Sequence, residues 1–177
     1  MAKNSQFWRA VPPAKVAPAL LLGCLTLFAE TYDGVAAAVG NHAIKKSEIN
    51  RDIRLTALLN GAKLDFSAPA QRKAAERLID RWMIRQEMVR RGYPDSSPAN
   101  AGEVFANLKA ARFRDAAEYQ QALSAYGVTE PELKAHVAWQ ASVLRFIAVR
   151  FQSQPFLPWL DQVRKQASIQ YRGELSQ

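Results

Sequence analysis

The stretch QRKAAERLIDRWMIRQEMVRRG, residues 71–92, decides how the rest of the chain is interpreted. Apolar side chains recur in it at the spacing of three and four residues that one face of an α-helix requires. This stripe consists of Ala75, Leu78, Ile79, Trp82, Met83 and Val89. Ser67 can cap the helix start, and Gly92 can take the left-handed closing position before Pro94. Because a helix with one apolar stripe is stabilised by what packs on it, we expect the other segments to be arranged around this helix.

The opposite side of this predicted helix carries Arg77, Arg81 and Arg85, four residues apart, which predicts one cationic ridge. Such a ridge can bind phosphate groups, but we interpret it as a solvated face. Asp80 on the same helix is interpreted as a member of an ordinary surface ion pair with Arg77 nearby.

Composition places the chain among ordinary globular proteins. It has 177 residues, of which 49% are hydrophobic and 23% charged, and one domain is the default at this length. The net charge of +8 fits contact with anionic surfaces, but it is also common in proteins that bind none. A single cysteine excludes an internal disulfide and a multi-cysteine metal site.

The N-terminus has the pattern of an export signal. Residues 1–15 are basic and lack acidic groups, and residues 16–29, VAPALLLGCLTLFA, are apolar and uncharged. This run is shorter than the roughly 20 residues that span a bilayer as a helix, so it predicts secretion from a bacterium. We therefore assign residues 1–34 to a signal or anchor and residues 35–177 to the folded domain.

Cys24 lies inside this run. The sequence Leu21-Leu22-Gly23-Cys24 resembles the bacterial lipobox, in which the cysteine is lipidated and becomes the new N-terminus. Residues 25–28 stay mostly apolar, unlike most mature lipoproteins. A signal cleaved near Ala29 and an uncleaved anchor are the alternatives, so two forms of membrane attachment stay open: a lipid on Cys24 or an uncleaved N-terminal segment.

After the signal, the chain predicts a hairpin and then helices. Residues 35–39 and 42–44 flank the turn Gly40-Asn41. Helices are predicted for residues 47–60 with Ser47 as the cap, for residues 98–111, for a segment between Asp115 and Gly127, for residues 130–151, and from Pro158 onward. The stripe of the fifth helix includes Leu133, Val137 and Leu144.

Residues 168–172, SIQYR, alternate as a half-buried strand does. A single strand needs a partner, and the other strand candidates lie at the far end of the domain. The predicted fold is therefore mainly α, with about six helices and a small β-sheet that pairs the N-terminal hairpin with the C-terminal strand.

No catalytic motif is present. The sequence contains no glycine-rich phosphate loop, no GxSxG and no HExxH. His42 and His136 are far apart in the sequence and are interpreted as surface or half-buried residues, and Trp82, Trp139 and Trp159 as core rather than ligand-stacking groups. We predict no catalytic residue, no cofactor, no metal site and, because of export, no nucleic-acid partner.

Three segments together resemble the N-terminal chaperone domain of the SurA group of periplasmic proteins. They are VAAAVGNHAIKKSEI at residues 35–49, LIDRWMIRQEMVRRGY at residues 78–93 and YQQALSAYGVTEPELK at residues 119–134. The resemblance extends from residue 35 to about residue 151. It implies a C-terminal strand that returns to the N-terminal hairpin, as the alternation at residues 168–172 also predicts.

The resemblance implies a periplasmic or envelope protein that binds unfolded or partly folded exported polypeptides, such as outer-membrane proteins in transit. Many relatives insert a parvulin-type prolyl isomerase domain, but only residues 152–158 separate the fifth and sixth helices here, so isomerase activity is not carried over. Two alternatives remain: an envelope assembly lipoprotein with one fixed partner, and a prolyl isomerase family member by descent.

The expected binding site is an apolar groove between helices with a polar rim. Several candidates must belong to the core instead. The candidate lining residues are Leu64, Phe66, Phe105, Phe113, Tyr119 and Tyr126.

Overall fold

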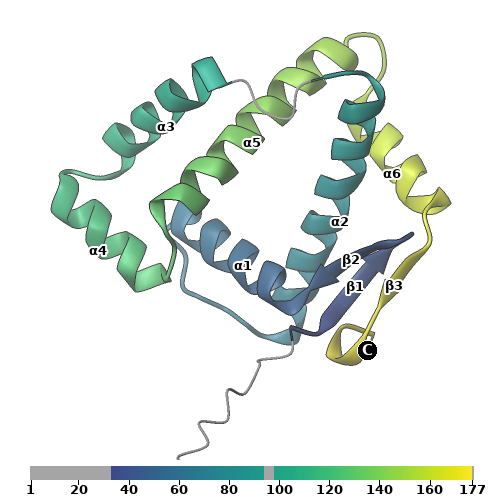
Figure 1. The fold of residues 1–177 in the computed structure, drawn as a ribbon, viewed down its shortest axis with the longest axis horizontal. Helices are drawn as coiled ribbons and strands as arrows, with labels where there is room; N and C mark the ends of the chain where they lie inside the picture. Colours follow the sequence, from purple (N-terminus) through teal and green to yellow (C-terminus); the bar gives the residue numbers. More distant parts are fainter. Residues whose placement is uncertain (1–32, 94–97, 177) are drawn as a thin grey trace, which may run out of the picture. The chain divides into compact units, whose positions relative to one another are not determined.

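Strand β1 (Val35–Val39) is the middle strand of a three-stranded antiparallel sheet in the computed structural model, which describes residues 33–93 and 98–176. Strand β2 (His42–Lys45) pairs with one edge of β1 and strand β3 (Ile169–Tyr171) with the other (Figure 1). Ala37 faces Ile44 on β2 and Tyr171 on β3. The predicted pairing between the hairpin and the C-terminal strand is confirmed.

Six helices lie between these strands in the described residues, which confirms the mainly α fold. Their bounds are α1 (Lys46–Asn60), α2 (Ala68–Arg90), α3 (Pro98–Arg112), α4 (Ala116–Tyr126), α5 (Glu130–Arg150) and α6 (Phe156–Gln166). A short 3-10 helix, η1 (Gly173–Ser176), follows β3.

The helix termini follow the predicted caps in most cases. Thr129 and Glu132 form a reciprocal capping box at the start of α5, and Gly127 ends α4 in the left-handed conformation with a φ of 60°. The prediction that Ser47 caps α1 is wrong. Its hydroxyl and its amide both donate to the carboxylate of Asp33, at 2.6 and 3.0 Å, and Lys45 is the N-cap residue.

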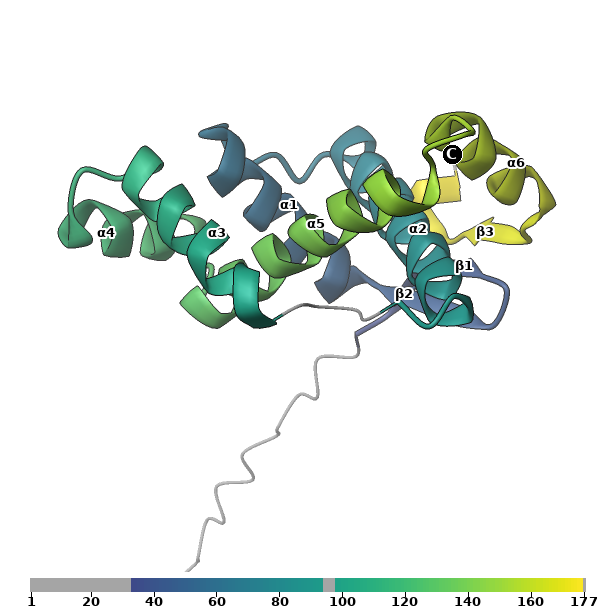
Figure 2. The same cartoon turned by 90° about the horizontal axis from the view of Figure 1, so that it is seen from above.

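The hydrophobic side chains form two cores. The first lies among the sheet, α2, α6 and the second half of α5, and the second among the end of α1, α3, α4 and the start of α5. Helices α1 and α5 supply both: Ile53 and Phe146 belong to the first core, whereas Leu58 and Leu133 belong to the second. Figures 1 and 2 show α3 and α4 at the far end of α5 from α6.

The α2 stripe is confirmed at Ile79 and Met83, which are buried, but three expectations built on helical stripes are wrong. Val89 is exposed, and no α2 side chain belongs to the second core among the described residues, so α3 and α4 pack on α1 and α5 instead. Leu144 is also wrongly assigned, because its side chain is 68% exposed while Phe146 is buried.

The C-terminal segment is anchored to both β1 and α2. The amide of Gly40 donates to the carbonyl of Ser168 and that of Arg172 to Ala36, both at 2.9 Å. The Arg72 guanidinium lies 3.5 Å from the ring centroid of Tyr171 and donates to the carbonyl of Leu175, whose side chain is buried in the first core. The N-terminal and C-terminal segments of the domain therefore belong to the same sheet and to the same core.

Deletion of residues 168–177 should lower stability strongly, although it leaves the six helices intact. It removes the buried Leu175 side chain and the strand that covers one edge of β1. Loss of one buried leucine side chain costs about 2–5 kcal/mol, so thermal unfolding followed by circular dichroism should give a Tm lower by about 5–15 °C. Gln170→Ala, at an exposed β3 position, is the control and should change the Tm little. If the truncated chain has the same Tm as the full chain, β3 is not part of the cooperatively folded domain.

Candidate functional site

An apolar groove with a volume of about 460 Å³ lies among α3, α4 and the start of α5. Phe105 and Tyr119 are buried beneath it, and Phe113 forms a half-buried wall. The rings of Phe113 and Tyr119 meet edge to face, with centroids 5.2 Å apart. The small side chains of Ala106 and Ala110 complete the α3 wall, so the groove is open to an extended apolar segment.

Charged side chains form the rim of this groove. The Lys109 ammonium lies 4.1 Å from the ring centroid of Tyr119 and 3.9 Å from the Glu130 carboxylate. Burial, and then the Glu130 carboxylate, raises the pKa of the Tyr119 hydroxyl to about 12, so the phenol stays protonated at neutral pH. Lys134 and Asp115 complete the polar lining.

The structure brings three of the six predicted groove residues together: Phe105, Phe113 and Tyr119. Tyr126 packs against the second core, and its hydroxyl donates to the carbonyl of Ala62 at 2.9 Å. Leu64 and Phe66 are each 38% exposed in the segment between α1 and α2, and neither lines the groove.

The lining residues predicted from the sequence did not include the charged residues of the rim or the two alanines of α3. Lys109, Glu130 and Lys134 line the groove but were not among the predicted lining residues. A signal for the alanines exists, because Ala106 and Ala110 are four residues apart on α3 and therefore share one helix face.

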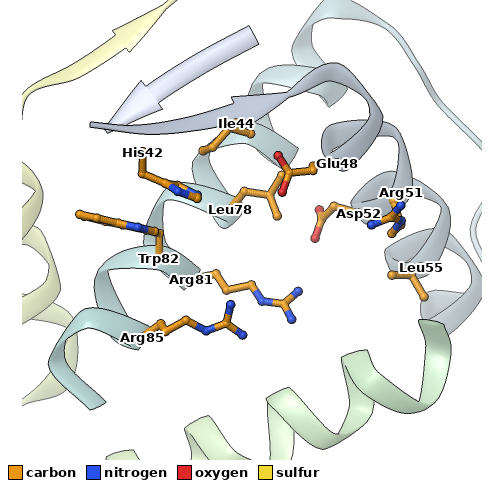
Figure 3. Close-up of a pocket in the computed structure, with 10 residues that line it drawn as sticks. All are labelled: His42, Ile44, Glu48, Arg51, Asp52, Leu55, Leu78, Arg81, Trp82 and Arg85. Atoms are coloured by element: carbon orange, nitrogen blue, oxygen red, sulfur yellow. The ribbon is translucent and has the colours of Figure 1, made fainter. Parts of the chain in front are cut away.

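A second, polar cleft lies among β2, α1 and α2, with a volume of about 240 Å³ (Figure 3). The guanidinium groups of Arg81 and Arg85 line it and lie 5.0 and 4.7 Å from the ring centroid of Trp139 on α5. His42 and Trp82 stack beside them, with ring centroids 5.6 Å apart and planes inclined by 14°. The cleft therefore combines cationic groups with a flat aromatic wall.

The prediction of a solvated arginine ridge on α2 holds for Arg77, whose side chain is 43% exposed, but not for Arg81 and Arg85, which are half-buried. Arg77 donates two hydrogen bonds, of 2.8 and 2.5 Å, to the buried carboxylate of Asp52 on α1. Arg81 and Arg85 lie against Trp139 on α5. Both cross-helix partners are distant in sequence, and this explains why the spacing on α2 alone did not reveal them.

Asp80 forms an ion pair, as predicted, but a half-buried one with Arg164 of α6 at 3.4 Å and not with the neighbouring Arg77. Burial raises the pKa of Asp80 above its ordinary value, while the charge of Arg164 opposes this shift. The interpretation of the tryptophans as core groups is confirmed for Trp139, whereas Trp82 also lines the polar cleft. Trp139 is buried in the first core, and Trp82 and Trp159 pack against it half-buried.

Comparison of the sequence with protein-family models and with curated proteins gives no match. Function is therefore inferred from the residues and their geometry. Among the residues that the structure describes, no group of three or more His, Cys, Asp or Glu side chains is arranged to hold a metal ion. Within the same residues, no helix combines the length and the apolar character that a membrane crossing requires.

His136 on α5 is buried, so its assignment to the surface or a half-buried position is wrong. Its Nε2 lies 3.1 Å from the Gln140 side-chain nitrogen, and its Nδ1 has no hydrogen-bond partner among the described residues. Burial, and then the positive charge of Arg81, lowers the pKa of His136 below its ordinary value, while Asp52 opposes this shift. The folded protein therefore favours the neutral imidazole.

This burial predicts that the free energy of unfolding falls as the pH drops from 7.5 to 5.5. The unfolded chain, with an ordinary histidine pKa near ~6.5, binds a proton more readily than the folded state, so acid favours unfolding. Urea unfolding at the two pH values should show a smaller decrease for His136→Gln than for the original chain. His42→Gln is the matched control and should retain most of the decrease. Equal pH dependence in the original chain and His136→Gln would show that His136 is not the group responsible.

Proposed function

We propose that this chain is a non-catalytic, chaperone-like module that binds unfolded or partly folded exported polypeptides in the cell envelope. The observation that carries the proposal is the groove among α3, α4 and α5, with Phe105, Phe113 and Tyr119 as its apolar surface and charged groups at its rim. Its volume of about 460 Å³ suits a few apolar side chains of an extended segment.

The chemistry of the groove favours a broad range of clients. Aromatic rings contribute apolar area without directional bonds, and each 100 Å² of apolar surface that leaves water contributes about 2.5 kcal/mol before ordering costs are subtracted. The polar rim keeps the unoccupied groove hydrated. Such a surface selects for apolar character rather than for a particular sequence, as a chaperone requires.

The architecture supports a binding role rather than an enzymatic one. The confirmed pairing of the hairpin with β3 agrees with what the resemblance to the SurA group implies. Helix α5 ends at Arg150 and α6 begins at Phe156, so no isomerase domain is inserted at that junction. We therefore expect the uncatalysed rate of prolyl isomerisation in the presence of this protein.

The proposed location follows from the N-terminal sequence. The export pattern and the lipobox-like Cys24 lie outside the described residues, and they support a periplasmic or membrane-attached protein only as sequence patterns. An exported protein is in the same compartment as other exported chains before these chains fold. The groove would bind them there.

Filling the groove should weaken polypeptide binding. Ala110 is an exposed residue of α3 that lines the groove, and the adjacent Ala111 is equally exposed but does not line it. We expect Ala110→Trp to weaken binding of a fluorescein-labelled, permanently unfolded polypeptide by about tenfold, equivalent to about 1.4 kcal/mol, as measured by fluorescence anisotropy. Ala111→Trp should bind like the original chain, and circular dichroism should show that both variants are folded.

Three results would contradict the proposal: equal binding by the two variants, no binding by the original chain, or co-purification of one dominant folded partner in place of many unfolded envelope proteins. The last result would favour the assembly lipoprotein.

A further inference from the structure

One end of the domain combines exposed aliphatic side chains with arginines. Among the described residues, the large apolar side chains that are more than half exposed, at 60–68%, are Val89, Leu144, Val149 and Leu157. They lie in two stretches, residues 87–93 and 143–160, which also contain Arg90, Arg91, Arg145 and Arg150. We infer that this end, called the terminal patch, binds the surface of an anionic lipid bilayer.

Side-chain contacts join the two stretches at one end of the molecule. The Arg150 side chain of α5 lies 3.8 Å from the Glu87 carboxylate of α2. The Phe151 ring, at the end of α5, lies 5.2 Å from the Phe156 ring of α6, measured between centroids. The last turns of α2 and α5 and the first turn of α6 therefore lie together (Figure 1), and the exposed residues 152–155 connect α5 to α6.

The charge balance of the terminal patch favours an anionic partner. Glu87, the only acidic residue of the two stretches, is 3% exposed, and three of the four arginines share its carboxylate. Together with the exposed Arg145, four arginines and one carboxylate give a net charge of +3. Asp95, in the part of the chain that the structure does not describe, would reduce this charge to +2. The attraction depends on this excess of positive charge and does not require a guanidinium without a partner.

The apolar side chains favour a bilayer over a soluble anion. Aliphatic side chains such as Val149 and Leu157 can enter the headgroup region while guanidinium groups pair with lipid phosphates. Arg145 and Val149 are one helical turn apart on α5 and so share one face. Tyr93 and Trp159 are half-buried at the same end, and such side chains are favoured where lipid meets water.

Other features of the chain agree with this partner. A second copy docked through the same end would bring like charges together, which disfavours a dimer. The sequence pattern of residues 1–34, as a lipidated signal or an anchor, would keep the domain close to a bilayer. The terminal patch shares no residue with the apolar groove, so the inference does not rest on the proposed function.

The test measures hydrogen–deuterium exchange of the full chain with vesicles of phosphatidylglycerol or of phosphatidylcholine. Residues 1–34 can enter either vesicle, so the readout is exchange in peptides that contain residues 152–154, not the total fraction bound. We expect phosphatidylglycerol vesicles to slow this exchange by about threefold, as for a surface covered about two-thirds of the time. Phosphatidylcholine vesicles should leave it unchanged.

Two double variants test the two kinds of side chain in the terminal patch. Arg90→Gln with Arg145→Gln removes two positive charges, and Val149→Gln with Leu157→Gln removes two aliphatic side chains. All four positions are exposed in the structure or nearly so, and circular dichroism should show that both variants are folded. With phosphatidylglycerol vesicles, exchange at residues 152–154 should return close to its rate without vesicles in each variant.

Lys63→Gln with Arg114→Gln is the matched control, because it also removes two positive charges at exposed positions, between α1 and α2 and between α3 and α4. This control should preserve most of the slowing. If a variant of the terminal patch fails to fold, the comparison of the two lipids with the original chain decides.

Equal exchange of the original chain with the two lipids overturns the inference. The same holds if the control pair loses the slowing as fully as the arginine pair, or if both variants of the terminal patch keep it. Slowing by a permanently unfolded polypeptide without vesicles would assign this end to polypeptides and also overturn the inference. None of these results concerns the apolar groove, whose function is tested separately with Ala110→Trp.

Discussion

The hydrogen bonding of β1 on both of its edges is the constraint on which the rest of the structure depends. β1 joins the hairpin partner β2 to β3, the last strand of the described chain, and so closes the helical domain end to end. Ala36 and Ala37 of β1 are buried in the first core, as are Ala74 and Ala75 of α2. This closure fixes α2, and α2 in turn presents Arg77, Arg81 and Arg85 to its neighbours.

Helices α1 and α5 connect the first core to the second core. Each of these two helices contributes side chains to the first core over one part of its length and to the second core over the other. The Asp52 carboxylate of α1 also accepts hydrogen bonds from Arg77 of α2. The groove among α3, α4 and the start of α5 lies over this second core, to which its lining residues Phe105 and Tyr119 belong.

Local signals in the sequence predicted the elements well, because caps and alternation act over a few residues. The Thr129 capping box and the strand at residues 169–171 are examples. Predictions failed where the partner is remote. Asp52 is 25 residues from its partner Arg77. The prediction for Leu144 assumed that α5 faces a single core along its whole length, whereas α5 packs into two. At the groove, aromatic character indicated three lining residues but could not separate them from Tyr126, whose position depends on the packing of α4.

Hydrogen–deuterium exchange of the full chain, alone and with an excess of a permanently unfolded polypeptide, shows whether the polypeptide binds in the groove. We expect slower exchange in the presence of the polypeptide within residues 105–119 and 130–134, which border the groove. The β1 amides should be among the slowest in both samples and unaffected by the polypeptide, because they belong to the closed sheet. Unchanged exchange around the groove, or protection confined to surfaces outside it, would contradict this proposal.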